Sequence, residues 1–163
     1  MTGRQLFPWI GGKARWADTL RLLLPDFADI TAYRDCFLGS GGMFYSITDL
    51  LASVEQVTLI DLNPDIINAH KAVRDAPDTL AELVAKHQER HSRKYVKNLS
   101  TRRDLAPVED AARFVYFMSV AFNATSSARV SGASRTALCA LTISGLRSVK
   151  VTCSTEASRS VME

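Results

Sequence analysis

Apolar and polar residues follow a helical spacing near the N-terminus. Trp16, Leu20, Leu23 and Leu24 come after a Gly-Gly turn, and Pro25 ends the pattern. Because positions three and four apart share one face of a helix, this spacing predicts a loop that leads into an amphipathic helix.

Two short β-rich segments interrupt the helical spacing in the first half of the chain. Residues 30–37 run into a glycine-rich turn, after which a helical pattern resumes. Residues 56–61 form the second expected strand, and residues 66–76 the helix that follows it. Two strand-to-helix steps in succession predict a parallel, doubly wound sheet of the α/β class.

The pattern changes to helices without strands from Pro77 onward. Residues 78–91 carry apolar positions on one face, and residues 107–122 are apolar enough for a well-buried helix. We therefore expect an α/β part over residues 1–76 and a helical region over residues 77–130.

The last stretch, residues 131–163, is expected to form a divergent tail. Beyond Phe122 the chain has no aromatic residue and no proline but many serines and threonines, a composition typical of weak order. One strand is expected at residues 148–153 and a helix at residues 136–143. Two explanations stay open: a frameshift in the gene from about Asn123, or a divergent tail whose strand returns to the sheet.

Composition and charge bear on whether the chain is globular and on whether it could bind nucleic acid. The 163 residues, 47% of them hydrophobic, suffice for one core. The net charge is +3, and basic residues concentrate between Lys86 and Asp104. That concentration is typical either of a surface that meets a phosphate backbone or of an ordinary solvated helix face that also carries Glu89.

Cysteine usage and hydropathy bear on the compartment. Three scattered cysteines without a Cys-x-x-Cys pair argue against a disulfide framework and against a zinc site, and they favour a reducing compartment. The sequence has no run of about 18 apolar residues of the kind that crosses a membrane. We expect a soluble, cytoplasmic protein with no membrane partner and no metal.

The candidate chemistry lies where the two expected strands end. Gly39, Gly41 and Gly42 lie between a strand and a helix, where missing Cβ atoms allow a ligand to approach the backbone. Asp61 ends the second strand 22 residues after Gly39, close to the offset at which a carboxylate reaches ribose hydroxyls. We favour ribose binding for Asp61 over the alternative, which is capping of the helix that follows. Neither a Walker A loop nor Gly-x-Gly-x-x-Gly is present, so a nucleoside is a better candidate ligand than a triphosphate.

Two further residues lie in the N-terminal glycine turn. Lys13 follows two glycines and can meet a carboxylate or phosphate, although an isolated lysine is more often a surface residue. Trp9 offers an aromatic plane for stacking or for core packing.

Three motifs in order resemble one known family. "PWIGGK", "DCFLGSGGMF" and "LIDLNPDIINAH" are similar to the opening of the Dam-type DNA adenine methyltransferases. That family shows a Trp-x-Gly-Gly-Lys block, an acidic-x-Phe-x-Gly-x-Gly block and an Asp-x-Asn-x-Asp block in the same order. The resemblance covers residues 8 to about 70.

The resemblance implies a Rossmann-like fold, S-adenosylmethionine as cofactor and double-stranded DNA as partner. It also implies that the helical residues 77–130 form a target-recognition-like region. In such enzymes the methyl group passes to the amino nitrogen of an adenine flipped out of the duplex. The implied cofactor-binding residues are Trp9, Lys13, Asp35, Phe37, Gly39, Gly41 and Asp61.

The chain departs from the family pattern further along. Ala124 follows Phe122-Asn123 where the family has glycine, and Arg129 is the one basic residue retained from the expected hairpin. The family's Asp-Pro-Pro-Tyr block is absent from the 163 residues, so no catalytic residue is assigned. His70, His87 and His91 are expected to be packing or surface residues.

The expectation is therefore a C-terminally incomplete Rossmann-like homologue of the site-specific adenine methyltransferases of restriction-modification systems. Its catalysis is expected to be impaired, and its exposed strand edge favours self-association or a complementing chain. The alternative is a non-enzymatic protein that binds S-adenosylmethionine or DNA, such as a counter-defence factor of a mobile element.

Overall fold

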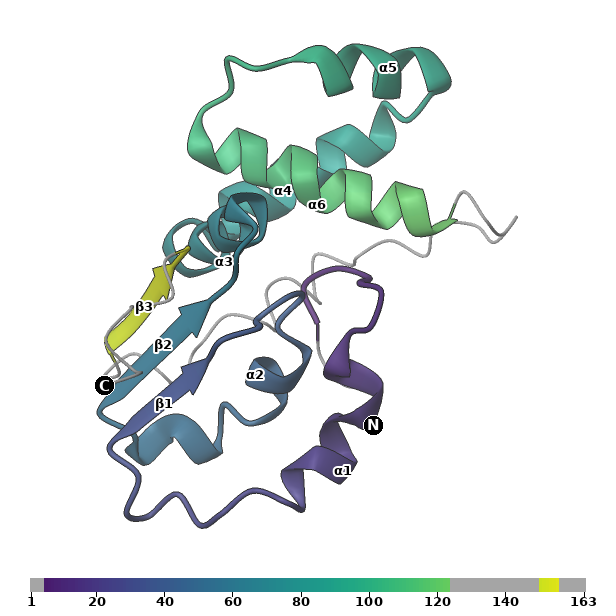
Figure 1. The fold of residues 1–163 in the computed structure, drawn as a ribbon. Coiled ribbons are helices and arrows are strands. Elements are labelled where there is room, and N and C mark those ends of the chain that lie inside the picture. Colours follow the sequence, from purple (N-terminus) through teal and green to yellow (C-terminus); the bar gives the residue numbers. More distant parts are fainter. Residues whose placement is uncertain (1–4, 124–149, 156–163) are drawn as a thin grey trace. The chain divides into compact units, whose positions relative to one another are not determined.

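The structure is a computed structural model that describes residues 5–123 and 150–155. These residues fall into two units (Figure 1). The first unit holds residues 5–67 and 150–155, and the second holds residues 68–123. The expected helix at 136–143 and the expected role of Arg129 lie outside the described residues.

The first unit contains the predicted strands and the glycine-rich turns. Its elements are the 3₁₀-helix η1 (Lys13–Trp16), α1 (Ala17–Arg21), β1 (Ala32–Asp35), α2 (Gly42–Ser46), the 3₁₀-helix η2 (Leu50–Ser53), β2 (Gln56–Ile60) and β3 (Lys150–Ser154). Helix α3 (Pro64–Asp75) begins in this unit and continues into the second.

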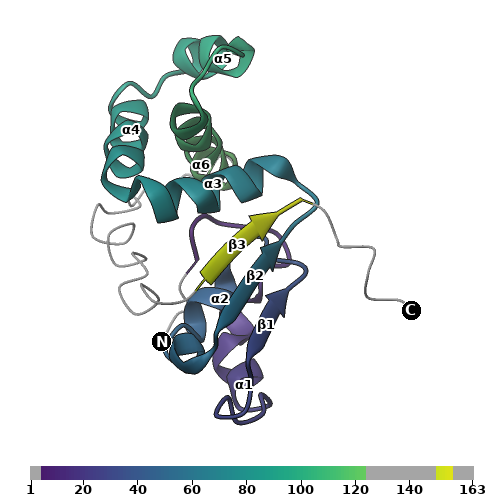
Figure 2. The same ribbon diagram turned by 90° about the vertical axis from the view of Figure 1, so that its left-hand side faces the viewer.

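The strands form a parallel sheet in the order β1-β2-β3. Tyr33 pairs with Val57, and Asp35 pairs with Leu59. Val57 and Leu59 are buried whereas Gln56 is exposed, so one face of the sheet packs into the core, and α1 and α2 lie on the same side of it (Figure 2). This arrangement confirms the predicted α/β class, and β3 overlaps the strand expected at 148–153.

The core of the first unit is built mainly from residues between the strands and behind the glycine loop. It includes Leu6, Phe7, Phe27, Leu38, Phe44, Ile47, Leu51, Val54, Val57, Leu59 and Ile66, each buried.

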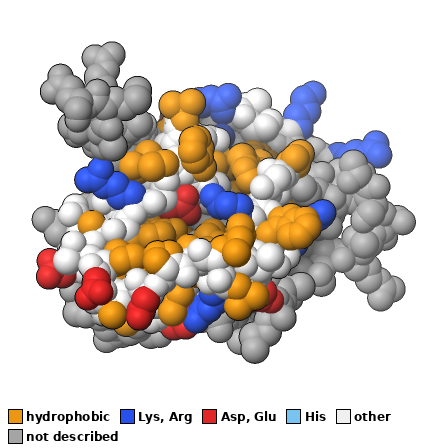
Figure 3. All heavy atoms as spheres, turned by 60° about the horizontal axis from the view of Figure 1, so that its bottom comes forward, with side chains coloured by type: hydrophobic (Ala, Val, Ile, Leu, Met, Phe, Trp, Pro, Cys, Tyr) orange, Lys and Arg blue, Asp and Glu red, His pale blue; other side chains and the backbone are white. Residues whose placement is uncertain are grey.

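The expected N-terminal helix is shorter than its sequence pattern predicted. Helix α1 ends at Arg21, and the amides of Leu22, Leu23 and Leu24 each donate to the carbonyl three residues back. Because a residue before proline avoids the helical region, Pro25 favours this early termination. Leu23 is consequently 76% exposed rather than packed. Figure 3 shows one face of the molecule, on which hydrophobic side chains lie among charged ones.

The second unit is helical, as the pattern beyond Pro77 predicted. After α3 it contains α4 (Pro77–Glu89), α5 (Arg93–Thr101) and α6 (Pro107–Asn123), with α4 packed on α6. Proline begins α4, where its missing N–H costs nothing. The buried residues of the second unit include Leu80, Ala81, Val84, Leu99, Ala111, Ala112, Val115 and Tyr116.

Two histidine–tyrosine hydrogen bonds join the helices of this unit. His87 Nδ1 lies 2.6 Å from the Tyr95 hydroxyl, and His91 Nδ1 lies 2.8 Å from the Tyr116 hydroxyl. The hydroxyl of Tyr116 has a raised pKa because it is buried. The half-buried His87 thus joins α4 to α5, whereas His91 is an exposed residue that hydrogen-bonds to α6.

Acid is expected to destabilise the second unit through His87. Burial lowers the pKa of this imidazole below its usual 6.5, Arg90 and Arg102 lower the pKa further, and Glu109 opposes them. A depressed pKa in the folded state means that the stabilisation is present above about pH 6.5 and is lost as the pH falls below it. The thermal midpoint should fall more steeply from pH 7.5 to 5.5 in the wild type than in His87→Gln.

Tyr95→Phe is the matched control, because it removes the hydrogen bond but leaves a titrating histidine. It should lower the midpoint at every pH and keep the steep acid dependence. Equal acid dependence in the wild type and His87→Gln would contradict the assignment.

Candidate functional site

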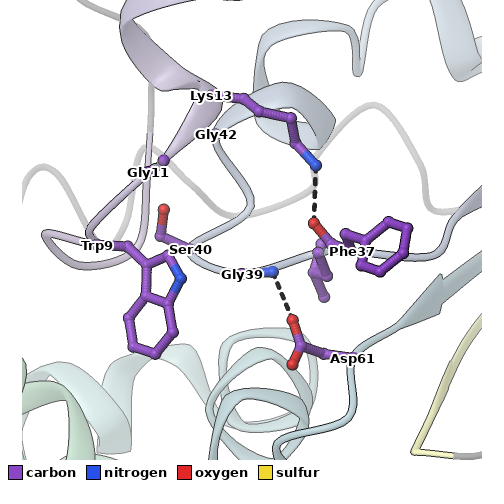
Figure 4. A pocket seen from close by; sticks show the side chains of 10 residues that line it. Trp9, Gly11, Lys13, Phe37, Gly39, Ser40, Gly42 and Asp61 are labelled. Carbon is purple, nitrogen blue, oxygen red and sulfur yellow. Dashed lines mark hydrogen bonds between the residues drawn. The ribbon is translucent and has the colours of Figure 1, made fainter.

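A pocket of about 310 Å³ opens at the carboxyl ends of β1 and β2. It is built from three segments of the first unit: the turn before η1, the glycine loop after β1 and the residue that follows β2 (Figure 4). The lining residues are Trp9, Gly11, Gly12, Lys13, Phe37, Leu38, Gly39, Ser40, Gly42 and Asp61. Ligands of parallel α/β sheets commonly bind at this edge.

The glycine loop has a backbone that other residues rarely adopt. Gly39 and Gly41 have φ values of +53° and +75°, in the left-handed region. Gly41 is also the residue that precedes α2. The Leu38 amide donates to the Ile60 carbonyl at 3.0 Å, which ties the loop to the end of β2.

Gly42 allows the loop to approach the N-terminal turn closely. A Cβ at this position would lie 2.7 Å from the backbone nitrogen of Ala14 and 2.9 Å from its Cα. Since no real Cβ makes such contacts, the two segments meet only because residue 42 is glycine.

Asp61 joins the two strand ends directly. Its Oδ2 accepts a hydrogen bond from the Gly39 amide at 2.8 Å (Figure 4). Its Oδ1 accepts a hydrogen bond from the Asn63 amide at 3.0 Å. Each carboxylate oxygen can accept a second bond. The half-buried carboxylate is therefore held in place and still has acceptor capacity toward the pocket.

Lys13 connects the N-terminal turn to the end of β1. Its ammonium donates to the Phe37 carbonyl at 2.7 Å (Figure 4). The same ammonium lies 3.5 Å from Asp35 Oδ1. The same Oδ1 accepts the Phe37 amide at 3.1 Å. Lys13 is thus not a free surface lysine but part of a small polar network.

Asp35 carries the most unusual atom of the site. The residue is only 8% exposed, and its Oδ2 is buried without a hydrogen-bond partner among the described residues. A buried carboxylate oxygen without a donor costs free energy, so it marks a position at which a ligand donor is favoured.

Trp9 and Phe37 are the aromatic residues of the lining. The Trp9 indole meets the Phe7 ring edge-on, with 5.8 Å between centroids, and a Cβ at Gly39 would lie 3.3 Å from its Cδ1. The Phe37 side chain is 83% exposed. In Figure 4 the two rings lie at opposite sides of the pocket, so they do not stack on each other.

The structure brings together most of the residues singled out from the sequence. Trp9, Lys13, Phe37, Gly39 and Asp61 line the pocket directly. Of the other two, Asp35 is joined to it through Lys13 and Phe37, and Gly41 shapes the loop without lining the pocket.

The cofactor-binding set implied by the family resemblance omits five lining residues, although Gly42 is among the loop glycines that the sequence singles out. These are Gly11, Gly12, Leu38, Ser40 and Gly42. Each lies within two positions of a residue already chosen, so the signal for them was membership of the two glycine-rich segments.

The described residues hold neither a cluster of potential metal ligands nor a helix that could cross a membrane. Residues 5–123 and 150–155 contain no group of three or more potential metal ligands. Within the same ranges, no helix is long and apolar enough to cross a membrane.

Comparison with known proteins gives consistent matches. Residues 9–140 match the D12 class N6 adenine-specific DNA methyltransferase family. The chain is also similar to the Type II methyltransferase M1.LlaDCHI of Lactococcus lactis subsp. cremoris, with 29% identity over 126 residues. That alignment covers 74% of this chain but 42% of the relative, so the chain spans less than half the length of this curated relative.

Proposed function

Since the chain belongs to the D12 class N6 adenine-specific DNA methyltransferase family, we propose that its pocket binds S-adenosylmethionine for methylation of adenine in DNA. The observation that carries the proposal is the Asp61 carboxylate, held by two backbone amides at the rim of the glycine-loop pocket. We further propose that the α/β part is a portion of a Rossmann-like fold.

The residues present fit the chemistry of this cofactor. Asp35 Oδ2, which has no hydrogen-bond partner within the described part of the chain, suits a cationic donor such as the α-ammonium of the methionine moiety. The remaining acceptor capacity of Asp61 suits vicinal ribose hydroxyls. The pocket volume of about 310 Å³ lies at the lower end of the range for small-molecule sites.

When bound, S-adenosylmethionine supplies an electrophilic methyl group on its sulfonium. The work of this chain's residues is binding and orientation. Asp61 would hold the ribose, Asp35 the ammonium and Lys13 the carboxylate, while Trp9 and Phe37 would shield the ligand from water. Gly39 and Gly41 would keep the loop backbone close to the ligand.

Transfer to adenine needs groups that this sequence does not contain. The 163 residues include no Asp-Pro-Pro-Tyr or Asn-Pro-Pro block, so we assign no catalytic residue and no acceptor for the adenine amino protons. We propose that residues outside this sequence, on the same or another polypeptide, supply them. Residues 1–76 would then bind the cofactor, residues 77–130 would serve the DNA, and residues 131–163 would add a strand to the sheet.

A second candidate is binding without turnover, which the missing block favours. The two candidates differ in a methyl-transfer assay with labelled S-adenosylmethionine and adenine-containing duplex DNA. Turnover by the 163 residues alone should stay at background. Turnover that appears after a polypeptide bearing the missing block is added supports the enzyme, and its absence in every mixture supports the binding protein.

Lys13→Met should weaken S-adenosylmethionine binding about tenfold, which corresponds to about 1.4 kcal/mol. The substitution removes a cation that holds the Phe37 carbonyl and faces Asp35. Isothermal titration of the folded chain measures this, with Lys71→Met, an exposed lysine of α3, as the control. No heat of binding with the wild-type chain, shown to be folded by circular dichroism, would refute the cofactor proposal.

A further inference from the structure

The region around α5 carries positive charge without compensation. The 14 residues from Arg90 to Arg103 contain six arginines and lysines and no acidic residue. All six cations are exposed, and none forms an ion pair with an acidic residue in the part of the chain that the structure describes. Protein surfaces usually intersperse both signs, so an uncompensated run indicates an anionic partner.

The three cations within α5 lie on one side of the helix. Tyr95, Val96 and Leu99 are the less exposed residues of α5, and they mark its inward side. With 3.6 residues per turn, Arg93, Lys94 and Lys97 fall within an arc of about 100° on the opposite side. These three residues are called the basic face of α5.

The backbone under the basic face is fixed within the second unit. Ser92 Oγ accepts the Tyr95 amide at 3.1 Å and caps the helix. The Tyr95 hydroxyl is held by His87 at 2.6 Å, and Arg113 Nη1 donates to the Arg102 carbonyl at 3.1 Å just after the helix. A partner therefore meets charges on an ordered helix, which lowers the entropy cost of binding.

We propose that the basic face of α5 binds the phosphate backbone of double-stranded DNA without reading its sequence. Three exposed cations on one helix face match a repeating line of phosphates, and the release of counterions drives such binding. The choice of DNA rather than another polyanion rests on the proposed function. The glycine-loop pocket plays no part in this contact.

The test compares two triple variants of the full 163-residue chain that remove equal charge. One is Arg93→Gln/Lys94→Gln/Lys97→Gln, and the other is Arg15→Gln/Arg34→Gln/Lys71→Gln, whose residues are exposed and lie outside residues 86–104. Fluorescence anisotropy with a labelled duplex of about 20 base pairs is measured over a range of salt concentrations. Each lost phosphate contact should reduce the slope of log K against log salt by about 0.9, so the first variant should lose about 2.7.

The expected result is at least a tenfold loss of duplex affinity at low salt in the basic-face variant and a much smaller loss in the control variant. Equal losses in both, or an unchanged slope in the first, would overturn the proposal, because only the total charge would matter. Titration with S-adenosylmethionine separates this from the proposed function. If the chain binds S-adenosylmethionine but not the duplex, the basic-face proposal fails and the pocket proposal stands. If it binds the duplex but not S-adenosylmethionine, the pocket proposal fails and the basic-face proposal stands.

Discussion

Asp61→Asn is expected to weaken S-adenosylmethionine binding by about a hundredfold, or about 2.7 kcal/mol. The carboxylate accepts from Gly39 and Asn63 and would accept from the ribose hydroxyls as well. Asparagine has one acceptor oxygen, so its NH₂ group must face either a backbone amide or the ligand. Loss of a hydrogen bond to a charged group is worth about 1.5–3 kcal/mol, which matches the expected effect.

Isothermal titration measures the effect, and Asp65→Asn is the matched control. Asp65 is an exposed carboxylate in the first turn of α3, four residues away and outside the pocket. It should leave the affinity within about twofold of the wild type, a change worth less than about 0.5 kcal/mol. If Asp61→Asn binds the cofactor as tightly as Asp65→Asn does, the ribose role of Asp61 is wrong.

Gly42→Ala is expected to destabilise the first unit by about 2–3 kcal/mol, in the range of overpacked cores. The new Cβ would lie 2.7 Å from the Ala14 nitrogen and 3.0 Å from the Ala14 Cβ. The obstacle is backbone rather than a flexible side-chain end, so η1 and the glycine loop must separate. Because both segments line the pocket, cofactor affinity should fall along with stability.

Gly11→Ala is the control that distinguishes a steric clash of the new Cβ from the cost of a left-handed backbone. Gly11 has a φ of +73°, but a Cβ there would meet no atom within 4 Å. Its alanine variant should lose about 1 kcal/mol, the cost of the left-handed backbone for an L-residue. Urea unfolding of the two variants measures the difference, and a larger loss for Gly11→Ala than for Gly42→Ala would contradict the close approach.

The pairing of the glycine loop with Asp61 was predictable from the sequence. Two strand-to-helix steps imply neighbouring parallel strands, whose carboxyl ends meet at one edge of the sheet. A residue that ends the second strand must then lie near the turn that follows the first. The contact between the Gly39 amide and Asp61 follows from this topology.

The end of α1 and the position of α5 could not be predicted from the spacing of apolar residues. The spacing predicted a helix that packs Leu23, but the turns before Pro25 end α1 early and expose that residue. The sequence pattern did not single out α5, because its residues are mostly charged or polar and only Tyr95, Val96 and Leu99 mark its inward side.

The sequence by itself determined the α/β class, the order of the three motifs and the family, since strand and helix periodicities and motif spacing are local properties of the chain. Only the tertiary structure decided how Lys13 reaches the Phe37 carbonyl, why residue 42 must be small and that Asp35 Oδ2 has no donor among the described residues. The first two are contacts between segments more than 20 residues apart, and the third is the lack of a contact. All depend on differences of a few tenths of an ångström in how segments pack, which local sequence patterns do not encode.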